Sequence, residues 1–224
     1  MERSPLSEAD LVRWAESLAG IARTGLAFTE SLYERERYEE ILAVAADIRA
    51  HAEDHPDPVE KVAEWMRTVG EGVAGYVTPK IAVGAAVGND DGELLLIKRP
   101  DSGFWLFPTG WADVGYSAAE IVVKEVREET GIDVEVVRLI AVLDGIRQGF
   151  TRVPLYSLLF QCRPVGGKLD GHPLETADLG WFGQDRLPSP LAGFGFWGDR
   201  VFTALAGGDV DVYFEPPRPE PWAR

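Results

Sequence analysis

Three glutamates with helical spacing are the residues of this chain best suited to chemistry: Glu125, Glu128 and Glu129. In a helix, residues three and four apart share a face, so these carboxylates would crowd together and repel one another by roughly 0.2–0.5 kcal/mol per pair. Hard oxygen ligands at this spacing suit Mg²⁺ or Mn²⁺. A metal site is one interpretation. The other is a solvated acidic face, which is common on glutamate-rich helices.

The segment around these glutamates has well-marked ends. Ser117 with Glu120 three residues later forms a capping-box pattern, and Gly131 follows the last helical residue. An aromatic run, residues 104–108, leads into Gly110. We therefore expect a helix from Ser117 to Thr130 that follows a glycine turn, which is a more specific setting for a metal than acidity alone.

The first 70 or so residues have the apolar spacing of helices. The pattern predicts a helix from Ser7 to Gly25, with Asp10 at the third position of its capping box. Two more are expected, one from Ser31 to a stop at His55-Pro56 and one over 59–69. Their apolar stripes favour core or dimer contacts over a cofactor pocket. A linker is indicated by the glycines that follow: Gly70, Gly72 and Gly75.

From residue 76 the pattern changes to strands. Residues 80–87 and 93–98 flank the turn sequence 89–92 and predict a hairpin. Further strands are expected at 134–143 and 155–162, with a turn at Gly166-Gly167. Strands around a central helix indicate an α/β (α+β) sandwich. The predicted domains are a helical one at 1–72, an α/β one at 76–205, and an extended, loosely ordered proline-rich tail at 206–224.

Composition restricts the partners. The formal net charge of −15 argues against DNA or another long nucleic acid, whose binding needs a surplus of Lys and Arg. Apolar runs are too short to span a membrane, and the first residues do not form a secretory signal, so a cytoplasmic location is expected. Cys162 is the single cysteine and lies in an apolar run, which favours a buried strand thiol over a nucleophile.

The segment from Gly110 to Ile132 resembles the Nudix box. The motif's glycines, its aliphatic positions and its three metal-binding glutamates match at the right spacing: Gly110, Glu125, Val126, Glu128, Glu129, Gly131 and Ile132. Two positions differ, since Tyr116 stands where the motif has Glu and Lys124 where it has Arg. In the family those two residues support the metal-binding glutamates through ion pairing. Stretches such as 14–26, 33–41 and 78–80 are similar to a subgroup with a helical N-terminal extension, which includes CDP-choline pyrophosphatases.

This resemblance implies a fold, a reaction and a set of metal ligands. The fold is a Nudix-type α/β/α sandwich with a mixed sheet, preceded by a small all-helical domain that makes a homodimer and forms one wall of the pocket. The reaction is Mg²⁺-dependent hydrolysis of the diphosphate bond of a CDP-choline-like or ADP-ribose-like substrate, which releases a nucleoside monophosphate. The implied metal ligands are the carboxylates of Glu125, Glu128 and Glu129 and the backbone carbonyl of Thr109.

Residues outside the glutamate helix offer further roles. Glu175 or Asp178 could act as general base, or could lie on a charged surface turn. Arg147 and Arg152, in the loop 145–154, could bind phosphate, although solvent exposure without a role is the favoured interpretation for each. Substrate contacts are expected from two residues of the glycine loop, Trp111 and Asp113. Trp111 could stack a base or contact a choline-like ammonium, whereas Trp105 is equally compatible with the core.

Two functions other than an active pyrophosphatase remain open. One is a catalytically weak nucleotide-binding or regulatory module on the same fold, which three crowded carboxylates disfavour. The other is an interaction protein whose helical N-terminal part binds a protein partner without metal-dependent turnover.

Overall fold

The computed structural model describes residues 7–52, 57–67, 69, 77–113, 115–192 and 197–217. The chain divides into two compact units, Met1–Pro79 with Thr151–Pro154, and Lys80–Phe150 with Leu155–Arg224. The expected helix stop at His55-Pro56 and the glycines at 70, 72 and 75 lie outside the described residues. Among the described helices, none is long and apolar enough to cross a membrane.

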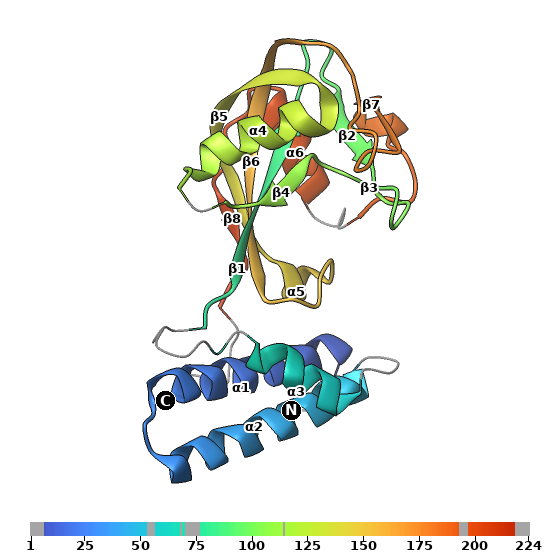
Figure 1. Cartoon of the computed structure of the whole chain (residues 1–224). Coiled ribbons are helices and arrows are strands. Elements are labelled where there is room, and N and C mark those ends of the chain that lie inside the picture. The colour runs from blue at the N-terminus through green and yellow to red at the C-terminus, as the bar shows by residue number, and fades with distance from the viewer. Residues whose placement is uncertain are drawn as a thin grey trace. The chain divides into compact units, whose positions relative to one another are not determined.

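The first unit is helical, as predicted, and contains α1 (Glu8–Phe28), α2 (Leu32–Ala52) and α3 (Pro58–Met66) (Figure 1). The capping box of Ser7 with Asp10 is present, so the predicted start of α1 is confirmed, although α1 continues one turn past Gly25. Small residues let α1 and α2 pack closely, since Ala19 and Ala22 of α1 and Ala45 of α2 are fully buried. The three helices enclose a core of their own.

The second unit is built on two sheets (Figure 1). The larger has the order β4-β1-β6-β5-β8, where β1–β6 and β5–β8 are parallel and the other pairs antiparallel, so it is mixed as expected. The smaller has the order β3-β2-β7. The strands have the following bounds: β1 Lys80–Val87, β2 Leu94–Lys98, β3 Trp105–Leu106, β4 Thr109–Trp111, β5 Ile132–Asp144, β6 Leu155–Gly167, β7 Asp178–Phe182 and β8 Tyr213–Phe214.

Helices cover both faces of the larger sheet. Alternate residues of β1 divide between two cores, because successive side chains of a strand point to opposite faces. Val83 packs in the core that includes Val126 of α4 (Ala118–Thr130), whereas Ala86 packs in the core that includes Val201 of α6 (Trp197–Leu205). The resulting α/β/α sandwich confirms the predicted fold class. Two short helices complete the unit, α5 (Gly145–Gln148) and the 3₁₀ helix Gln184–Arg186.

Three local predictions need correction. The turn at 89–92 forms, with the Asn89 N–H donating to Glu93 O at 3.0 Å, but β1 and β2 belong to different sheets and share one bridge, Gly88–Leu94. Gly166 and Gly167 are the last residues of β6, paired with β5, and do not form a separate turn. Residues 206–217 are not a separate tail, because β8 extends the larger sheet beside β5.

Candidate active site

Helix α4 carries the three glutamates and begins and ends where the sequence predicts. Ser117 accepts a hydrogen bond from the Glu120 N–H, and the Glu120 carboxylate accepts one from the Ser117 N–H in return. Gly131 ends the helix in the left-handed region at φ 74°, a conformation that glycine adopts without strain. Ile121, Val122 and Val126 anchor one side of α4 to the sheet, so the glutamates are held against a rigid surface.

Glu129 is buried, with 1% of its surface exposed, and its carboxylate accepts a hydrogen bond from the Thr109 N–H at 2.8 Å. Burial raises the pKa of the Glu129 carboxyl to about 8, against the lowering effect of the Thr109 hydrogen bond. The negative charges of Glu125 and Glu175 also raise this pKa. A carboxylate kept out of water beside two others is the kind of group that a cation would stabilise.

Glu125 lies against β4. A Cβ atom added to Gly110 would be 2.1 Å from the Glu125 carboxyl carbon, so the carboxylate occupies space that only glycine leaves free. Partial burial raises the pKa of the Glu125 carboxyl, Lys124 lowers it, and Glu128 and Glu175 raise it further. Glycine at position 110 is therefore needed by the side chain of Glu125.

Glu128 is more exposed and lies on the side of α4 that carries Lys124. The Lys124 ammonium is 3.9 Å from a Glu128 oxygen, 4.0 Å from a Glu125 oxygen and 3.1 Å from an Asp113 oxygen. The hydrogen bond to Asp113 is the largest of the effects that raise the pKa of Lys124. Asp113, expected to contact substrate, is thus engaged with a lysine of the glutamate helix.

The three carboxylates do not converge on one point. Over the described residues, no group of three Asp, Glu, His or Cys side chains is arranged to hold a metal ion. Glu129 turns inward to the Thr109 N–H, while Glu128 stays at the surface near Lys124. The predicted shared face exists, but the oxygens on it point in different directions.

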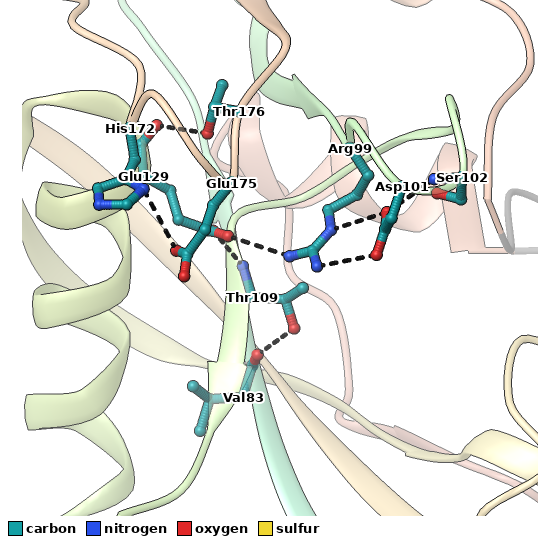
Figure 2. A network of polar contacts seen from close by, with 9 residues as sticks. All are labelled: Val83, Arg99, Asp101, Ser102, Thr109, Glu129, His172, Glu175 and Thr176. Carbon is teal, nitrogen blue, oxygen red and sulfur yellow. Dashed lines mark hydrogen bonds and ion pairs between the residues drawn. The ribbon is translucent and has the colours of Figure 1, made fainter.

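Arg99 is a site residue that the sequence analysis missed. Its guanidinium makes two hydrogen bonds to Asp101, at 3.4 and 3.2 Å, and lies 3.7 Å from Glu129 (Figure 2). The Asp101 hydrogen bond raises the pKa of Arg99, and the charges of Glu129 and Glu175 add to this effect. The available signal was a basic residue directly after the buried strand β2, where the chain turns toward β3.

Glu175 belongs to the segment between β6 and β7, and the structure brings it to the carboxylates of α4. Its charge raises the pKa of both Glu125 and Glu129. Glu175 lies 3.9 Å from the ring nitrogen Nδ1 of His172 (Figure 2). Thr176 holds this segment to α4, because its hydroxyl donates to the Glu129 carbonyl at 2.9 Å. Asp178, the other candidate for general base, is the first residue of β7, and its backbone lies opposite that of Lys98 in the β2–β7 strand pair.

Comparison with known protein families shows which family has this fold and this helix. A model of the NUDIX domain matches residues 78–205, which is more than half of the chain and includes all of α4. The chain belongs to the Nudix family.

The similarity to known proteins also includes the helical residues before the Nudix domain. Residues 9–66 match a family described as a UDP-X-like, N-terminal oligomerisation domain. A Bacillus subtilis (strain 168) protein named "Putative ADP-ribose pyrophosphatase YjhB" is 37% identical over 180 residues, covering 80% of this chain and 82% of that protein. Together with the fold, these matches identify the chain as a Nudix hydrolase with a helical N-terminal extension.

Solved structures of known name are also similar to this chain. A UDP-X diphosphatase is similar with a TM-score of 0.54 at 28% identity, over 92% of this chain and 99% of that one. An ADP-ribose pyrophosphatase from Streptococcus suis 89-1591 has a TM-score of 0.52 at 32% identity, over 62% of this chain and all of that one.

Nudix hydrolases use divalent metal ions, and the donor set of this chain fits one. The chemistry of the site is that of a hard cation: carboxylate oxygens on one helical face, two of them with raised pKa values because they are buried and near like charges. The space at Gly110 accommodates the Glu125 carboxylate. The backbone positions of Glu125, Glu128 and Glu129 on α4 place these side chains on one helical face.

The remaining predicted site residues lie elsewhere or have other partners. Arg147 donates to the Pro216 carbonyl at 2.7 Å. Arg152 belongs to the helical unit, where it donates to the Ala52 carbonyl and pairs with Glu8. Both arginines thus have partners of their own within their units. Trp111 is 53% exposed at the end of β4, with the Lys80 ammonium 5.3 Å from its ring centre, whereas Trp105 is buried in the core.

Proposed function

We propose that this Nudix hydrolase cleaves the diphosphate bond of a nucleoside diphosphate linked to a second group, in a reaction that depends on Mg²⁺ or Mn²⁺. The observation that carries the proposal is the cluster of Glu129, Glu125 and Glu175, in which like charge and burial raise the pKa values of two carboxyls. The relatives named as ADP-ribose pyrophosphatases and UDP-X diphosphatase support this substrate class. A CDP-choline-like substrate belongs to the same class.

Residues of α4 would hold the metal through the carboxylates of Glu125, Glu128 and Glu129, with the Thr109 carbonyl as a further ligand. The bound metal would supply charge neutralisation at the diphosphate and lower the pKa of a water. Glu175, from a different segment, would accept the proton of the attacking water. Arg99 lies near the Glu129 carboxylate and would add positive charge close to the diphosphate.

The products follow from the bond that breaks. Water oxygen bonds to one phosphorus, the bridging oxygen leaves with the other phosphorus, and the products are a nucleoside monophosphate and the phosphorylated second group. A small nucleotide substrate of this kind is consistent with the acidic chain and with a cytoplasmic enzyme, and requires neither DNA nor a membrane.

Turnover of the purified chain tests the proposal. It should be measured with Mg²⁺ on UDP-glucose, CDP-choline, ADP-ribose and a nucleoside triphosphate, with detection of the monophosphate. Loss of a residue that supports a metal ligand costs roughly 10- to 100-fold in activity. We expect Glu129→Gln, which changes a ligand itself, to lower kcat by at least this factor. Glu135→Gln, on the exposed end of β5, is the matched control and should leave turnover unchanged. Metal-independent turnover, or equal rates for the two variants, would contradict the proposal. Absence of turnover on every substrate would favour a binding or regulatory module.

The proposed assembly is a homodimer made by the helical unit. Trp14, Ile21 and Phe28 occur at intervals of seven residues along α1 and are all exposed, so they form one apolar stripe. Exposed apolar residues aligned on one helix face are typical of an interface. The match of residues 9–66 to an oligomerisation domain supports a second copy of this chain as the partner.

A further inference from the structure

The Lys124 side chain is placed where it interacts with three carboxylates at once. It extends from α4 one residue before Glu125 and four before Glu128, and its ammonium approaches oxygens of both at 4.0 and 3.9 Å. The same ammonium donates a hydrogen bond to the Asp113 carboxylate, at 3.1 Å. The ammonium is therefore held closest to Asp113 and further from the two glutamates.

Asp113 belongs to the loop that connects β4 to α4. It lies two residues after β4, the strand whose Gly110 contacts Glu125. Its ion pair with Lys124 connects the loop between β4 and α4 to the middle of the glutamate helix. An exposed ion pair contributes little to stability by itself, about 0–1 kcal/mol. Its position matters more, because an ammonium that left Asp113 would be free to move onto Glu125 or Glu128.

One of the two departures from the Nudix box, Lys124, belongs to this pair. Lys124 stands where the motif has Arg, and Tyr116, which stands where the motif has Glu, is exposed at the surface. Lysine still provides a positive charge at its position, but tyrosine provides no negative one. Asp113, three residues earlier in the same loop, supplies a carboxylate that reaches the lysine.

We propose that Asp113 is a positioning residue that holds the Lys124 ammonium away from the metal-binding oxygens of Glu125 and Glu128, in place of the glutamate that the motif has at position 116. The inference rests on the proposed function for its link to catalysis. It assigns Asp113 to the support of the metal-binding helix and not to substrate contact. Asp113 acts through Lys124 alone.

Mn²⁺ affinity, measured by calorimetry without substrate, tests the proposal independently of turnover. Asp113→Asn should weaken Mn²⁺ binding by about 10-fold, the lower end of what supporting residues contribute at metal sites. In the Lys124→Met background the same substitution should have no further effect, because no ammonium remains to be held. Equal losses in both backgrounds would overturn the proposal.

Restoring the motif supplies a second test. Adding Tyr116→Glu to Asp113→Asn should recover Mn²⁺ affinity and turnover, because a carboxylate is again available to Lys124. A substrate ligand would behave differently: Asp113→Asn would raise KM at saturating Mg²⁺, leave Mn²⁺ affinity unchanged and resist rescue. That result would overturn the assignment.

A second ion pair on the same helix serves as control. Arg127 pairs with Asp133 at 2.7 Å, and both side chains are about half exposed, as are Lys124 and Asp113. Asp133→Asn should leave Mn²⁺ affinity unchanged. Thermal unfolding of each variant establishes that it is folded. If Asp113→Asn weakens Mn²⁺ binding only while Lys124 is present, and no substrate is cleaved, the proposed function fails and the positioning role stands.

Discussion

The carboxylate of Glu125 occupies the space beside Gly110 that any side chain at position 110 would fill, since a Cβ atom there would lie 2.1 Å from the carboxyl carbon. The backbone of Gly110 is not in the left-handed region that requires glycine, since no positive φ occurs there. The glycine is thus needed for Glu125 and not for a turn.

Gly110→Ala should therefore displace Glu125 without preventing folding. We expect turnover to fall by about 10- to 100-fold, the cost of moving a catalytic group by about 1 Å. Turnover and Mn²⁺ affinity are the measurements. Gly20→Ala in α1 is the matched control, because its Cβ would meet Val77 at an ordinary 4.0 Å. An unchanged Gly110→Ala enzyme would show that the Glu125 carboxylate is free to lie elsewhere.

The pKa of Glu129, raised to about 8, predicts how the stability of the metal-free protein depends on pH. An unfolded chain releases this proton near the ordinary carboxyl pKa of 4.5, so between pH 4.5 and 8 the folded state binds more protons than the unfolded state. Stability from this group is therefore present at low pH and is lost as pH rises toward 8.

Thermal unfolding of the metal-free protein from pH 5.5 to 8.5 measures this dependence. Glu16 and Glu125, whose pKa values burial also raises, contribute in the same direction, so the comparison must be made with a variant. Glu129→Gln carries no titratable proton there and should show a smaller fall in Tm across this range. Parallel curves for the two proteins would contradict the raised pKa. Mn²⁺ affinity should rise with pH over the same range, because the metal requires the deprotonated carboxylate.

Lys80 beside Trp111 predicts the charge preference of the group attached to the diphosphate. The Lys80 ammonium already lies over the Trp111 ring, so a choline ammonium would meet a like charge there. Lys80→Met should raise the ratio of kcat/KM for CDP-choline to that for CDP-glycerol, a neutral analogue, by about 3- to 10-fold. Lys168→Met, an exposed lysine after β6, should leave the ratio unchanged. An unchanged ratio for Lys80→Met would mean that this group does not approach Trp111.

The stripe on α1 predicts which residues would stabilise the proposed homodimer. Ile21→Lys with Phe28→Lys should weaken dimerisation by about 30-fold or more, since even one central apolar contact contributes about 2 kcal/mol. Light scattering after size separation measures the change, and circular dichroism establishes that the helices remain. Val44→Lys, at an exposed apolar position of α2, is the control. A wild-type monomer, or a dimer unaffected by the double substitution, would refute the stripe as the interface.

Local sequence patterns predicted the elements around the site because short-range contacts determine them. Ser117 and Gly131 mark the ends of α4, and the strand β1 has the predicted bounds, 80–87. The hairpin at 89–92 was wrong as a strand pairing because turn residues determine where the chain reverses, while packing against α4 and α6 determines which sheet each strand joins. Residues 206–217 were predicted to be a tail because nothing nearby in sequence indicates their partner. Tyr213–Phe214 pair with β5, which lies some 70 positions earlier.

The sequence by itself determined the family, the glutamate helix and the identity of its acidic residues, because helical periodicity and a motif of fixed spacing need no distant contact. Only the tertiary structure decided which residues join them. Arg99 and Glu175 reach α4 from separate segments, Asp113 turns to Lys124, and Arg147 and Arg152 find other partners. The physical reason is that a side chain's electrostatic environment depends on distances in space between elements far apart in the chain. Those distances are set by how the sheets and helices pack.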